Sequence, residues 1–298
     1  MKVILDCDPG VDDALAIMFL IAEKVKLEAI TTVAGNHEVD KTSYNALRIL
    51  DVLGEDRVPV YRGSKGPLTR SLVTAEHIHG SDGLGDSNLP PPKRKVEKED
   101  ASEFLARFVD ENTDKVHLIA TGPLTNIAKA FRYRPWIVKK IESFTIMGGC
   151  FFLTPFGYGN VTKLSEFNFF TDPEATYYVF KSGTKPNVVG LDITQDPGVA
   201  ITDQIFGILE GVAKRIVEKP FRKLGIFHLH DPIAVASFIY PDIFKFKLFN
   251  VSISLYDGDE RGMCIVDRRG IYSPNANIAY KVNRREFLLK FLKAISKV

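Results

Sequence analysis

The sequence lacks the features that mark secreted, membrane-embedded or nucleic-acid-binding proteins. Its three cysteines in 298 residues, Cys7, Cys150 and Cys264, are too few and too far apart for a disulfide framework or a CxxC metal site. No apolar run is long enough to cross a membrane, and no signal peptide precedes the acidic N-terminal motif. A net charge of +2, from 39 basic and 37 acidic residues, gives no electrostatic basis for binding nucleic acid. We therefore expect reduced thiols and a cytoplasmic protein without a membrane or nucleic-acid partner.

The signatures of two common nucleotide-binding loops are also missing. No GxGxxG follows the first apolar segment, and no Walker A sequence occurs anywhere. HGSDGLGD, at 79–86, is rich in glycine, but it lies in a long segment, 63–92, that has little hydrophobic periodicity. These absences leave a nicotinamide or nucleoside triphosphate cofactor without support.

Strand-like and helix-like patterns alternate along the chain. Hydrophobic residues make up 45% and charged residues 26%, as in ordinary globular proteins. Strands are predicted at 3–7, 27–34, 58–62, 116–120, 144–147, 188–193, 251–256 and 263–267. Helices are predicted from Val11, at 42–53, 101–112, 127–131, 173–181, 201–217 and 233–239, and from Arg285. This order predicts an α/β fold, with a single domain over 1–298 and an open, Rossmann-like, mostly parallel sheet flanked by helices.

Four carboxylates fall within eight positions near the start of the chain, in the motif DCDPGVDDA. Asp6 and Asp8 end the first predicted strand, and Asp12 and Asp13 begin the helix that follows. Acids this close raise one another's pKa unless a positive group joins them, and a hard cation such as Ca²⁺ or Mg²⁺ takes several carboxylate oxygens. An EF-hand loop fits poorly, because the glycine comes one position early and no Glu closes the loop. The motif therefore indicates a metal site. Cys7 lies inside it, where the carboxylates disfavour a nucleophilic thiolate.

Polar or glycine-flanked residues end several other predicted strands. Asp8, Asn36, Thr121, Met147 and Asp192 each stand at or just beyond such an end. Parallel sheets bind ligands beyond the carboxyl ends of their strands, so we expect one shared site there.

Six segments, in order, resemble the motifs of the nucleoside hydrolase family. They are DCDPGVDDA, HGSDGLGD, ATGPLTNIA, the MGG turn, GNVTKLSEFNFFTDPEA and HDPIAVA, and they span about residues 3–240. The resemblance implies hydrolysis of ribonucleosides to ribose and free base with a bound Ca²⁺. It also implies a small-molecule ribonucleoside substrate and a homodimer or homotetramer.

The same resemblance implies a role for each matching residue. For calcium it implies the carboxylates of Asp8, Asp13 and Asp231 and the backbone carbonyl of Thr121. For ribose binding it implies Asp12, Asn36, Asn160, Glu166 and Asn168, with Met147 in the pocket wall. Asp8 would also be the general base on a calcium-bound water, His230 would protonate the leaving base, and His79 would line the base pocket.

Two segments depart from the family pattern. Residues 150–159 form a longer connection than usual, which would make an extra lip over the site or an oligomer contact. Residues 218–229 lack the tyrosines that family members often place beside the base, and Phe221, Phe227 or His228 would have to substitute. The preference for purine or pyrimidine bases stays open, as does the choice between dimer and tetramer.

Two other functions compete with the nucleoside hydrolase. Asp6-Cys7-Asp8 after a strand also resembles the DxD motif of Mg²⁺-dependent phosphohydrolases, and this reading leaves the EFN and HDP segments unexplained. A non-catalytic nucleoside-binding protein would keep the ribose cage without releasing base. Assays on nucleosides and on p-nitrophenyl phosphate separate these alternatives.

Overall fold

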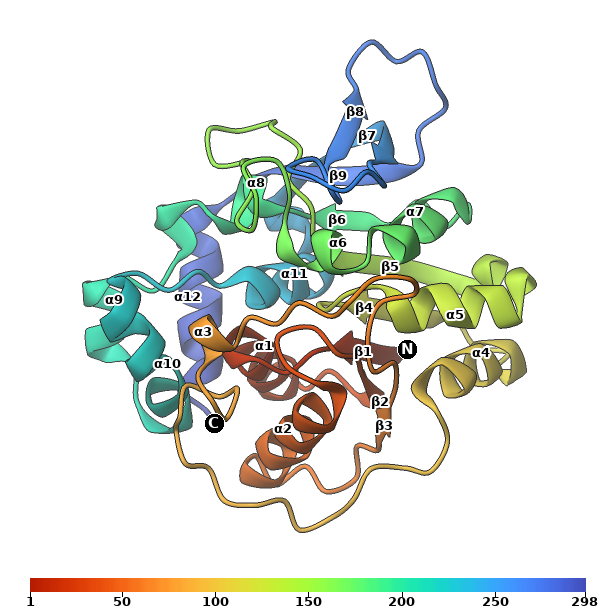
Figure 1. The fold of residues 1–298 in the computed structure, drawn as a ribbon. Coiled ribbons are helices and arrows are strands. Elements are labelled where there is room, and N and C mark those ends of the chain that lie inside the picture. The colour runs from red at the N-terminus through yellow and green to blue at the C-terminus, as the bar shows by residue number, and fades with distance from the viewer.

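A nine-stranded sheet forms the centre of the protein in the computed structural model, which describes residues 1–298 (Figure 1). Its strand order is β3-β2-β1-β4-β5-β6-β9-β7-β8. The strands are β1 (Lys2–Cys7), β2 (Leu27–Thr32), β3 (Val60–Arg62), β4 (Val116–Ala120), β5 (Ile141–Met147), β6 (Asn187–Val189), β7 (Phe244–Ile253), β8 (Cys264–Asp267) and β9 (Ala276–Val282). Strands β1 to β6 and β9 run parallel to one another, whereas β7 pairs antiparallel with β9, and β8 pairs antiparallel with β7 at the edge of the sheet. The predicted α/β fold with a mostly parallel sheet is confirmed.

Helices cover both faces of this sheet. The longer ones are α1 (Val11–Ala22), α2 (Val39–Val52), α4 (Ala101–Glu111), α5 (Thr125–Tyr133), α7 (Pro173–Lys181), α10 (Gly211–Leu224), α11 (His230–Ile239) and α12 (Arg284–Ile295). The shorter ones are α3 (Glu76–His79), α6 (Phe167–Thr171), α8 (Leu191–Thr194), α9 (Asp203–Ile208) and the 3₁₀ turns η1 (Pro135–Lys140), η2 (Pro197–Val199) and η3 (Pro241–Ile243).

Strand β1 divides the core because its side chains alternate between the two faces. Val3, Leu5 and Cys7 pack into the larger hydrophobic cluster with α1, α2, α10, α11 and α12. Ile4 packs into the second cluster with α4, α5 and α7. Burial on both faces explains why the strand reads as a nearly continuous apolar run in the sequence.

The elements predicted from the sequence differ from the structure at several places. The predicted strand 188–193 ends as β6 at Val189, and α8 begins at Leu191. Gly190 between them lies so close to the carbonyl oxygen of Gly149 that a Cβ would stand 2.6 Å from it. The predicted helix 201–217 is two helices, and α10 begins at Gly211, which has a φ of +60°. Strand β9 was not predicted, and β7 begins at Phe244, well before the expected start at 251.

The carboxyl ends of the parallel strands meet at one side of the sheet, and the long connection between β3 and α4 crosses that side (Figure 1). Asn126 anchors the start of the connection, since its Oδ1 accepts from the backbone N–H of Ser64 at 2.9 Å. The backbone N–H of Ala75 donates to the carbonyl oxygen of Asn36 at 3.0 Å further along. These contacts bring α3 to the strand ends. No helix in the structure is both long and apolar enough to cross a membrane.

Candidate active site

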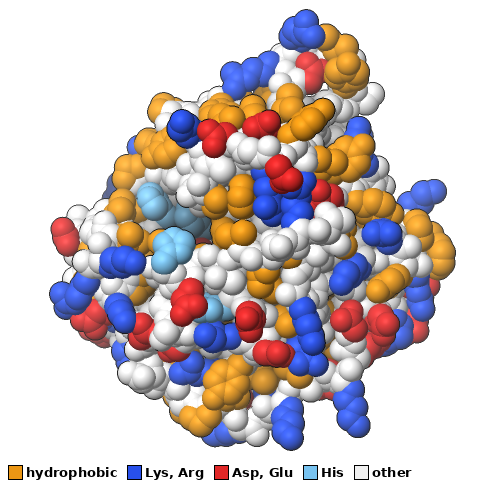
Figure 2. Space-filling model, in the orientation of Figure 1, with side chains coloured by type: hydrophobic (Ala, Val, Ile, Leu, Met, Phe, Trp, Pro, Cys, Tyr) orange, Lys and Arg blue, Asp and Glu red, His pale blue; other side chains and the backbone are white.

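A cavity of about 250 Å³ opens at the carboxyl ends of the parallel strands. Histidine side chains border a hollow on this face in Figure 2. The lining residues are Asp12, Asn36, Ala75, His77, Ile78, His79, Thr121, Met147, Asn160, Val161, Glu166, Phe167, Asn168, Gln195, Leu224, Ile226, Phe227, His228, His230 and Asp231. Ten of the twelve residues predicted from the sequence are in this set, and the other two, Asp8 and Asp13, are buried beside it.

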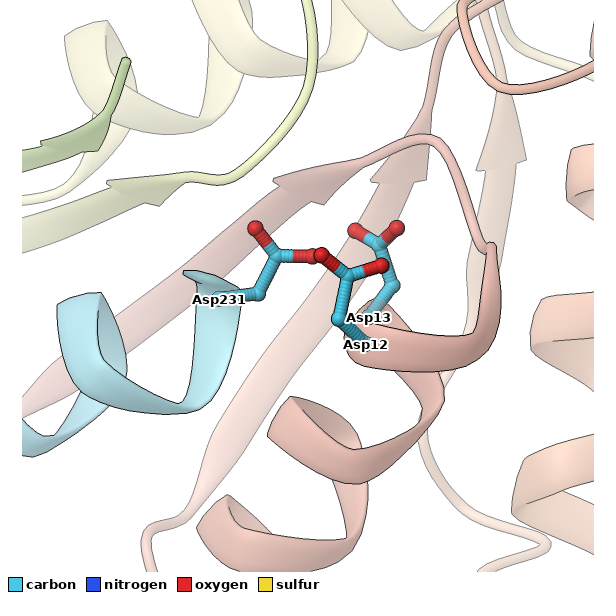
Figure 3. A group of neighbouring side chains, drawn as sticks. All are labelled: Asp12, Asp13 and Asp231. Carbon is cyan, nitrogen blue, oxygen red and sulfur yellow. The ribbon is translucent and has the colours of Figure 1, made fainter. Parts of the chain in front are cut away.

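Three carboxylates from two helix N-termini converge at the inner end of the cavity (Figure 3). Asp12 and Asp13 stand in the first turn of α1, and Asp231 stands in the first turn of α11. One oxygen of each lies within 4.8 Å of the others, and all three residues are buried. The positive ends of both helix dipoles favour negative charge here. The dipoles alone do not remove the repulsion, because burial and the neighbouring carboxylates raise the pKa of Asp12 to about 8.

Asp8 lies next to this group, directly after β1. Its Oδ2 accepts from the backbone N–H of Asn36 at 2.7 Å, and the Asn36 side chain donates to the Asp8 carbonyl and to Oδ2 of Asp13, both at 3.2 Å. Burial first, and then the charge of Asp13, raise the pKa of Asp8 well above its ordinary value. The hydrogen bonds from Asn36 therefore orient Asp8, but they do not offset the effect of burial on its pKa.

This donor set fits a hard cation. Oδ1 of Asp8 and Oδ1 of Asp12 are buried and have no hydrogen-bond partner. Unpaired buried carboxylate oxygens are costly unless an opposite charge compensates them. Oxygen is also the ligand type that calcium and magnesium prefer. The converging carboxylates include Asp12, which was predicted as a ribose ligand, whereas the predicted ligand Asp8 lies just outside this group of three.

Thr121, directly after β4, and Asn168, in α6, line one part of the cavity. The Thr121 hydroxyl donates to Oδ1 of Asp13 at 2.8 Å, and the Thr121 carbonyl accepts from Nδ2 of Asn168 at 2.7 Å. Asn168 Nδ2 also lies 3.3 Å from the Met147 carbonyl oxygen. These contacts commit the Asn168 nitrogen to the protein and leave its Oδ1 as the atom able to accept from a ligand.

Glu166 has a structural task that the sequence did not reveal. It is the N-cap of α6, and its carboxylate accepts from the backbone N–H groups of Asn168, Phe169 and Gly149 at 2.8, 3.1 and 2.9 Å. Asn160 is held nearby, because its Oδ1 accepts from the backbone N–H of Phe167 at 3.0 Å. Three of the predicted ribose residues, Asn160, Glu166 and Asn168, thus lie together around α6.

Two histidines from different elements line the cavity beside the carboxylates, and Nδ1 of His79 lies 3.9 Å from Oδ1 of Asp12. Nδ1 of His79 accepts from the backbone N–H of Val11 at 3.1 Å, and burial lowers the pKa of His79 to about 3. Nδ1 of His230 lies 2.7 Å from the hydroxyl oxygen of Thr194. Burial lowers the pKa of His230 as well. Both imidazoles are therefore neutral at pH 7 in the free protein.

The cavity is also lined by side chains that the sequence only partly identified. Phe227 and His228 line it, as two of the three suggested replacements for tyrosine, whereas Phe221 stacks on Phe206 at 4.4 Å between ring centroids and is not a lining residue. Gln195 was missed. Its Nε2 donates to the carbonyl oxygens of Phe156 and Tyr158 at 2.8 and 2.9 Å, so it holds segment 150–159 beside the cavity.

Asp6, the first residue of the DxD alternative, is not part of the cavity lining. Its Oδ1 accepts from Thr31 at 2.6 Å and from Asn126 at 2.8 Å, and burial raises its pKa to about 7. A phosphohydrolase nucleophile at this position would need access to substrate. Cys7 is buried in the core, and its thiol pKa is raised by burial.

Known proteins that match this chain are nucleoside hydrolases. The family model described as inosine-uridine preferring nucleoside hydrolase matches residues 3–289. The chain is 38% identical to the pyrimidine-specific ribonucleoside hydrolase RihA of Shewanella oneidensis, over 96% of this chain and 93% of that protein. It is 35% identical to RihA of Shewanella woodyi, over 96% and 95%. Among solved structures, a purine-preferring ribonucleoside hydrolase from Gardnerella vaginalis has a TM-score of 0.90 at 30% identity, covering 100% of this chain and 98% of that one. An inosine-guanosine nucleoside hydrolase has a TM-score of 0.89 at 29% identity, covering 99% and 98%.

Proposed function

The chain belongs to the inosine-uridine preferring nucleoside hydrolase family, and from this premise we propose that it is a calcium-dependent member in which Asp8 activates the attacking water. It is a hydrolase that cleaves the N-glycosidic bond of ribonucleosides to ribose and free base, a reaction of nucleoside salvage. The family is metal-dependent, and calcium as the ion is part of the proposal. The observation that carries it is the buried group of Asp12, Asp13 and Asp231 with Asp8 beside it, because Oδ1 of Asp8 and Oδ1 of Asp12 lack any hydrogen-bond partner.

The residues that would hold the ion are all oxygen donors. They are Asp8, Asp13, Asp231 and the backbone carbonyl of Thr121. Calcium accepts such ligands in flexible geometry, and when bound it supplies positive charge that lowers the pKa of a nearby water. Asp12 stands close enough to serve either the ion or a ribose hydroxyl, which is consistent with its place in the converging group.

Asp8 is the proposed general base. Its free Oδ1 would accept the proton of the attacking water, while the backbone N–H of Asn36 keeps Oδ2 in place. The carboxylates and amides around the cavity would stabilise the positive charge that develops on the ribosyl group as the bond to the base breaks. Asn36, Asn160, Glu166 and Asn168 are proposed to orient the ring hydroxyls, with Met147 in the wall beneath them.

The leaving base is proposed to lie between His79 and His230. Nε2 is the ring nitrogen of His230 that has no protein partner, so we assign it as the hydrogen-bond donor to the departing base, in place of the full proton transfer that the resemblance implies. His79 would contact the base from α3. We further propose a preference for uridine and cytidine, because the curated relatives at 35–38% identity are pyrimidine-specific. The structural neighbours with purine names are less similar in sequence, at 29–30% identity.

A reducing-sugar assay tests this function directly. Uridine, cytidine, inosine, adenosine and guanosine are each incubated with the purified protein, with added calcium and with excess chelator. We expect sugar release from the two pyrimidine nucleosides, loss of release with chelator, and recovery when calcium is restored. Unchanged activity in chelator would contradict the calcium proposal, and faster release from the purine nucleosides would contradict the pyrimidine preference.

The phosphohydrolase alternative predicts turnover of p-nitrophenyl phosphate in magnesium, which we do not expect because Asp6 does not line the cavity. A nucleoside-binding protein without catalysis would bind uridine and release no ribose. The cytoplasmic location and the homodimer or homotetramer remain predictions. Cell fractionation and light scattering on the purified protein test them.

A further inference from the structure

Thr194 stands behind His230 in a position that no predicted role explains. It is the last residue of α8, the short helix that replaced the end of the predicted strand, and it is fully buried. Its hydroxyl oxygen lies 2.7 Å from Nδ1 of His230, and no other side-chain hydrogen bond is formed by this hydroxyl. This buried hydroxyl has one partner, a ring nitrogen of His230 in the cavity wall. It can therefore fix the orientation of the imidazole and the position of its proton.

The hydroxyl proton decides the state of the imidazole. A neutral histidine carries one N–H, and the partner of the other nitrogen sets which nitrogen it is. The Thr194 O–H has no other acceptor within reach. It therefore donates its hydrogen bond to Nδ1 of His230. The ring proton of His230 is then on Nε2, the nitrogen left free for the cavity.

The base of α8 is rigid enough to hold Thr194 in this place. The backbone N–H of Leu191 donates to the Gly149 carbonyl at 2.9 Å. The carboxylate of Asp192 accepts from the backbone N–H groups of Phe151 and Leu153 at 2.7 and 2.5 Å. The helix is thereby tied both to the turn after β5 and to segment 150–159.

We propose that Thr194 is a positioning residue that holds the His230 ring through Nδ1, so that Nε2–H is directed at the leaving base. This inference rests on the proposed role of His230 in nucleoside hydrolysis. In the step, the C1′–N bond breaks and its electron pair passes to the base nitrogen, which is stabilised by a hydrogen bond from Nε2–H. Water adds its hydroxide to C1′ and gives its proton to Asp8. The proton that completes the free base comes from solvent, so His230 ends the step as it began.

Three variants isolate the hydroxyl. Thr194→Val removes the hydroxyl and keeps the side-chain shape, whereas Thr194→Ser keeps the hydroxyl. Thr176→Val is the matched control, since Thr176 is also fully buried and its hydroxyl donates to the backbone carbonyl of Asp172 at 2.9 Å, away from the cavity. On uridine, we expect Thr194→Val to lower kcat by up to about 10²-fold, the scale of a misplaced reacting group, with little change in KM. The Ser variant and the Thr176 control should stay near wild type.

Two further readouts separate positioning from general damage. p-Nitrophenyl riboside has a leaving group that departs without a donor, so Thr194→Val should hydrolyse it at nearly the wild-type rate. In a His230→Ala background, adding Thr194→Val should cost nothing more on uridine, because the two residues act as one unit. Nitrogen-15 spectra of labelled histidine should show the Nε2–H form of His230 in wild type and its loss in Thr194→Val.

The proposal is overturned if Thr194→Val slows both substrates equally, if it slows the His230→Ala enzyme further, or if His230 carries its proton on Nδ1 in wild type. These results leave the proposed function standing, because wild-type release of ribose from uridine is measured separately. Absence of that release would instead reject the proposed function. Activity of Thr194→Val on p-nitrophenyl riboside also shows that the variant is folded.

Discussion

The backbone N–H of Val11 donates a hydrogen bond to Nδ1 of His79 at a distance of 3.1 Å. Val11 begins α1, so one of the donors that a helix N-terminus leaves without an intrahelical partner is satisfied by a side chain from α3. Since Nδ1 accepts, the proton of the neutral ring is on Nε2. With its pKa lowered to about 3, His79 presents a fixed N–H and has no second proton to give. It is therefore suited to recognise an acceptor atom of the base rather than to protonate it.

His79→Ala is expected to weaken substrate binding and to leave the chemical step nearly intact. Loss of one hydrogen bond to a bound base costs about 0.5–1.5 kcal/mol, which should raise KM for uridine by roughly 2- to 10-fold with kcat almost unchanged. Steady-state kinetics on uridine measures both constants. His117→Ala, at a histidine of β4 that is not in the cavity lining, is the control. A fall in kcat of about 10²-fold at constant KM would contradict this binding role and show that His79 acts in the chemical step.

Asp8→Asn is expected to be folded and nearly inactive. The Asn side chain still offers an oxygen to the backbone N–H of Asn36, so the local contact survives. It cannot accept a proton, and the loss of a placed general base costs about 10²–10⁴-fold in rate. Turnover of uridine in saturating calcium, with the melting temperature measured beside it, checks this. Asp40→Asn, at an exposed residue paired with Arg62, serves as the control, and wild-type kcat in Asp8→Asn would rule out the base assignment.

Wild-type protein is expected to reject 2′-deoxyuridine strongly, and Asn168→Ala should relax this selectivity. Oδ1 of Asn168 is the atom left to accept from a ribose hydroxyl, because Nδ2 is bonded to the Thr121 carbonyl. A site built around a hydroxyl discriminates against the analogue without it by on the order of 10⁴-fold in kcat/KM. The ratio of kcat/KM for uridine and 2′-deoxyuridine is the measurement. Glu166→Ala is a poorer probe, since it removes the cap of α6 and should lower stability as well. Equal kcat/KM values in wild type would remove the ribose-cage assignment.

Much of the fold could be predicted because the local pattern and the tertiary structure agree. The strand at 116–120 and the helix at 173–181 were placed with their observed boundaries. The strand predicted at 188–193 was wrong beyond Val189, because a short apolar run also suits a buried helical turn. Strand β9 was not predicted because its sequence, ANIAYKV, contains Ala, Asn and Lys, which are depleted in strands.

The site was predicted to a different extent for different residues. Residue spacing alone indicated a cation at the four carboxylates Asp6, Asp8, Asp12 and Asp13, because they share one strand–helix junction. Asp6 does not join the others, since its side chain is hydrogen-bonded to Thr31 and Asn126 instead. Asp231 joined them only through the family resemblance, since convergence of α1 and α11 is a property of the packed fold. Gln195 and Thr194 could not be found, because an amide and a hydroxyl have no motif until the fold places them beside the cavity.

The metal-free protein should lose stability as pH rises from about 5 to 8. Burial raises the pKa of Asp12 to about 8 and that of Asp6 to about 7, and it raises that of Asp8 as well. The unfolded chain gives up these protons near pH 4, so between pH 4 and 8 the folded state binds more protons than the unfolded state at these carboxyls. His79 and His230, whose pKa burial lowers, oppose this effect only below about pH 6.5, where the unfolded histidines are protonated. Stability then falls with rising pH, because its slope follows the difference in bound protons. Calcium should remove most of this slope by favouring the ionised carboxylates.

Thermal melts at pH 5 and pH 8, in chelator and in calcium, test this expectation. In chelator the melting temperature should be lower at pH 8 by at least about 2–4 °C, the shift that 1 kcal/mol gives in a chain somewhat shorter than this one. Calcium at 100 times its Kd adds about 2.7 kcal/mol to the free energy of unfolding. The melting temperature should rise more at pH 8 than at pH 5, because protons compete with calcium for the carboxylates at the lower pH. The double variant Asp8→Asn, Asp231→Asn removes two of the buried acids and should flatten the chelator curve and weaken the calcium response together. Parallel pH curves with and without calcium would mean that the buried carboxylates do not form the metal site.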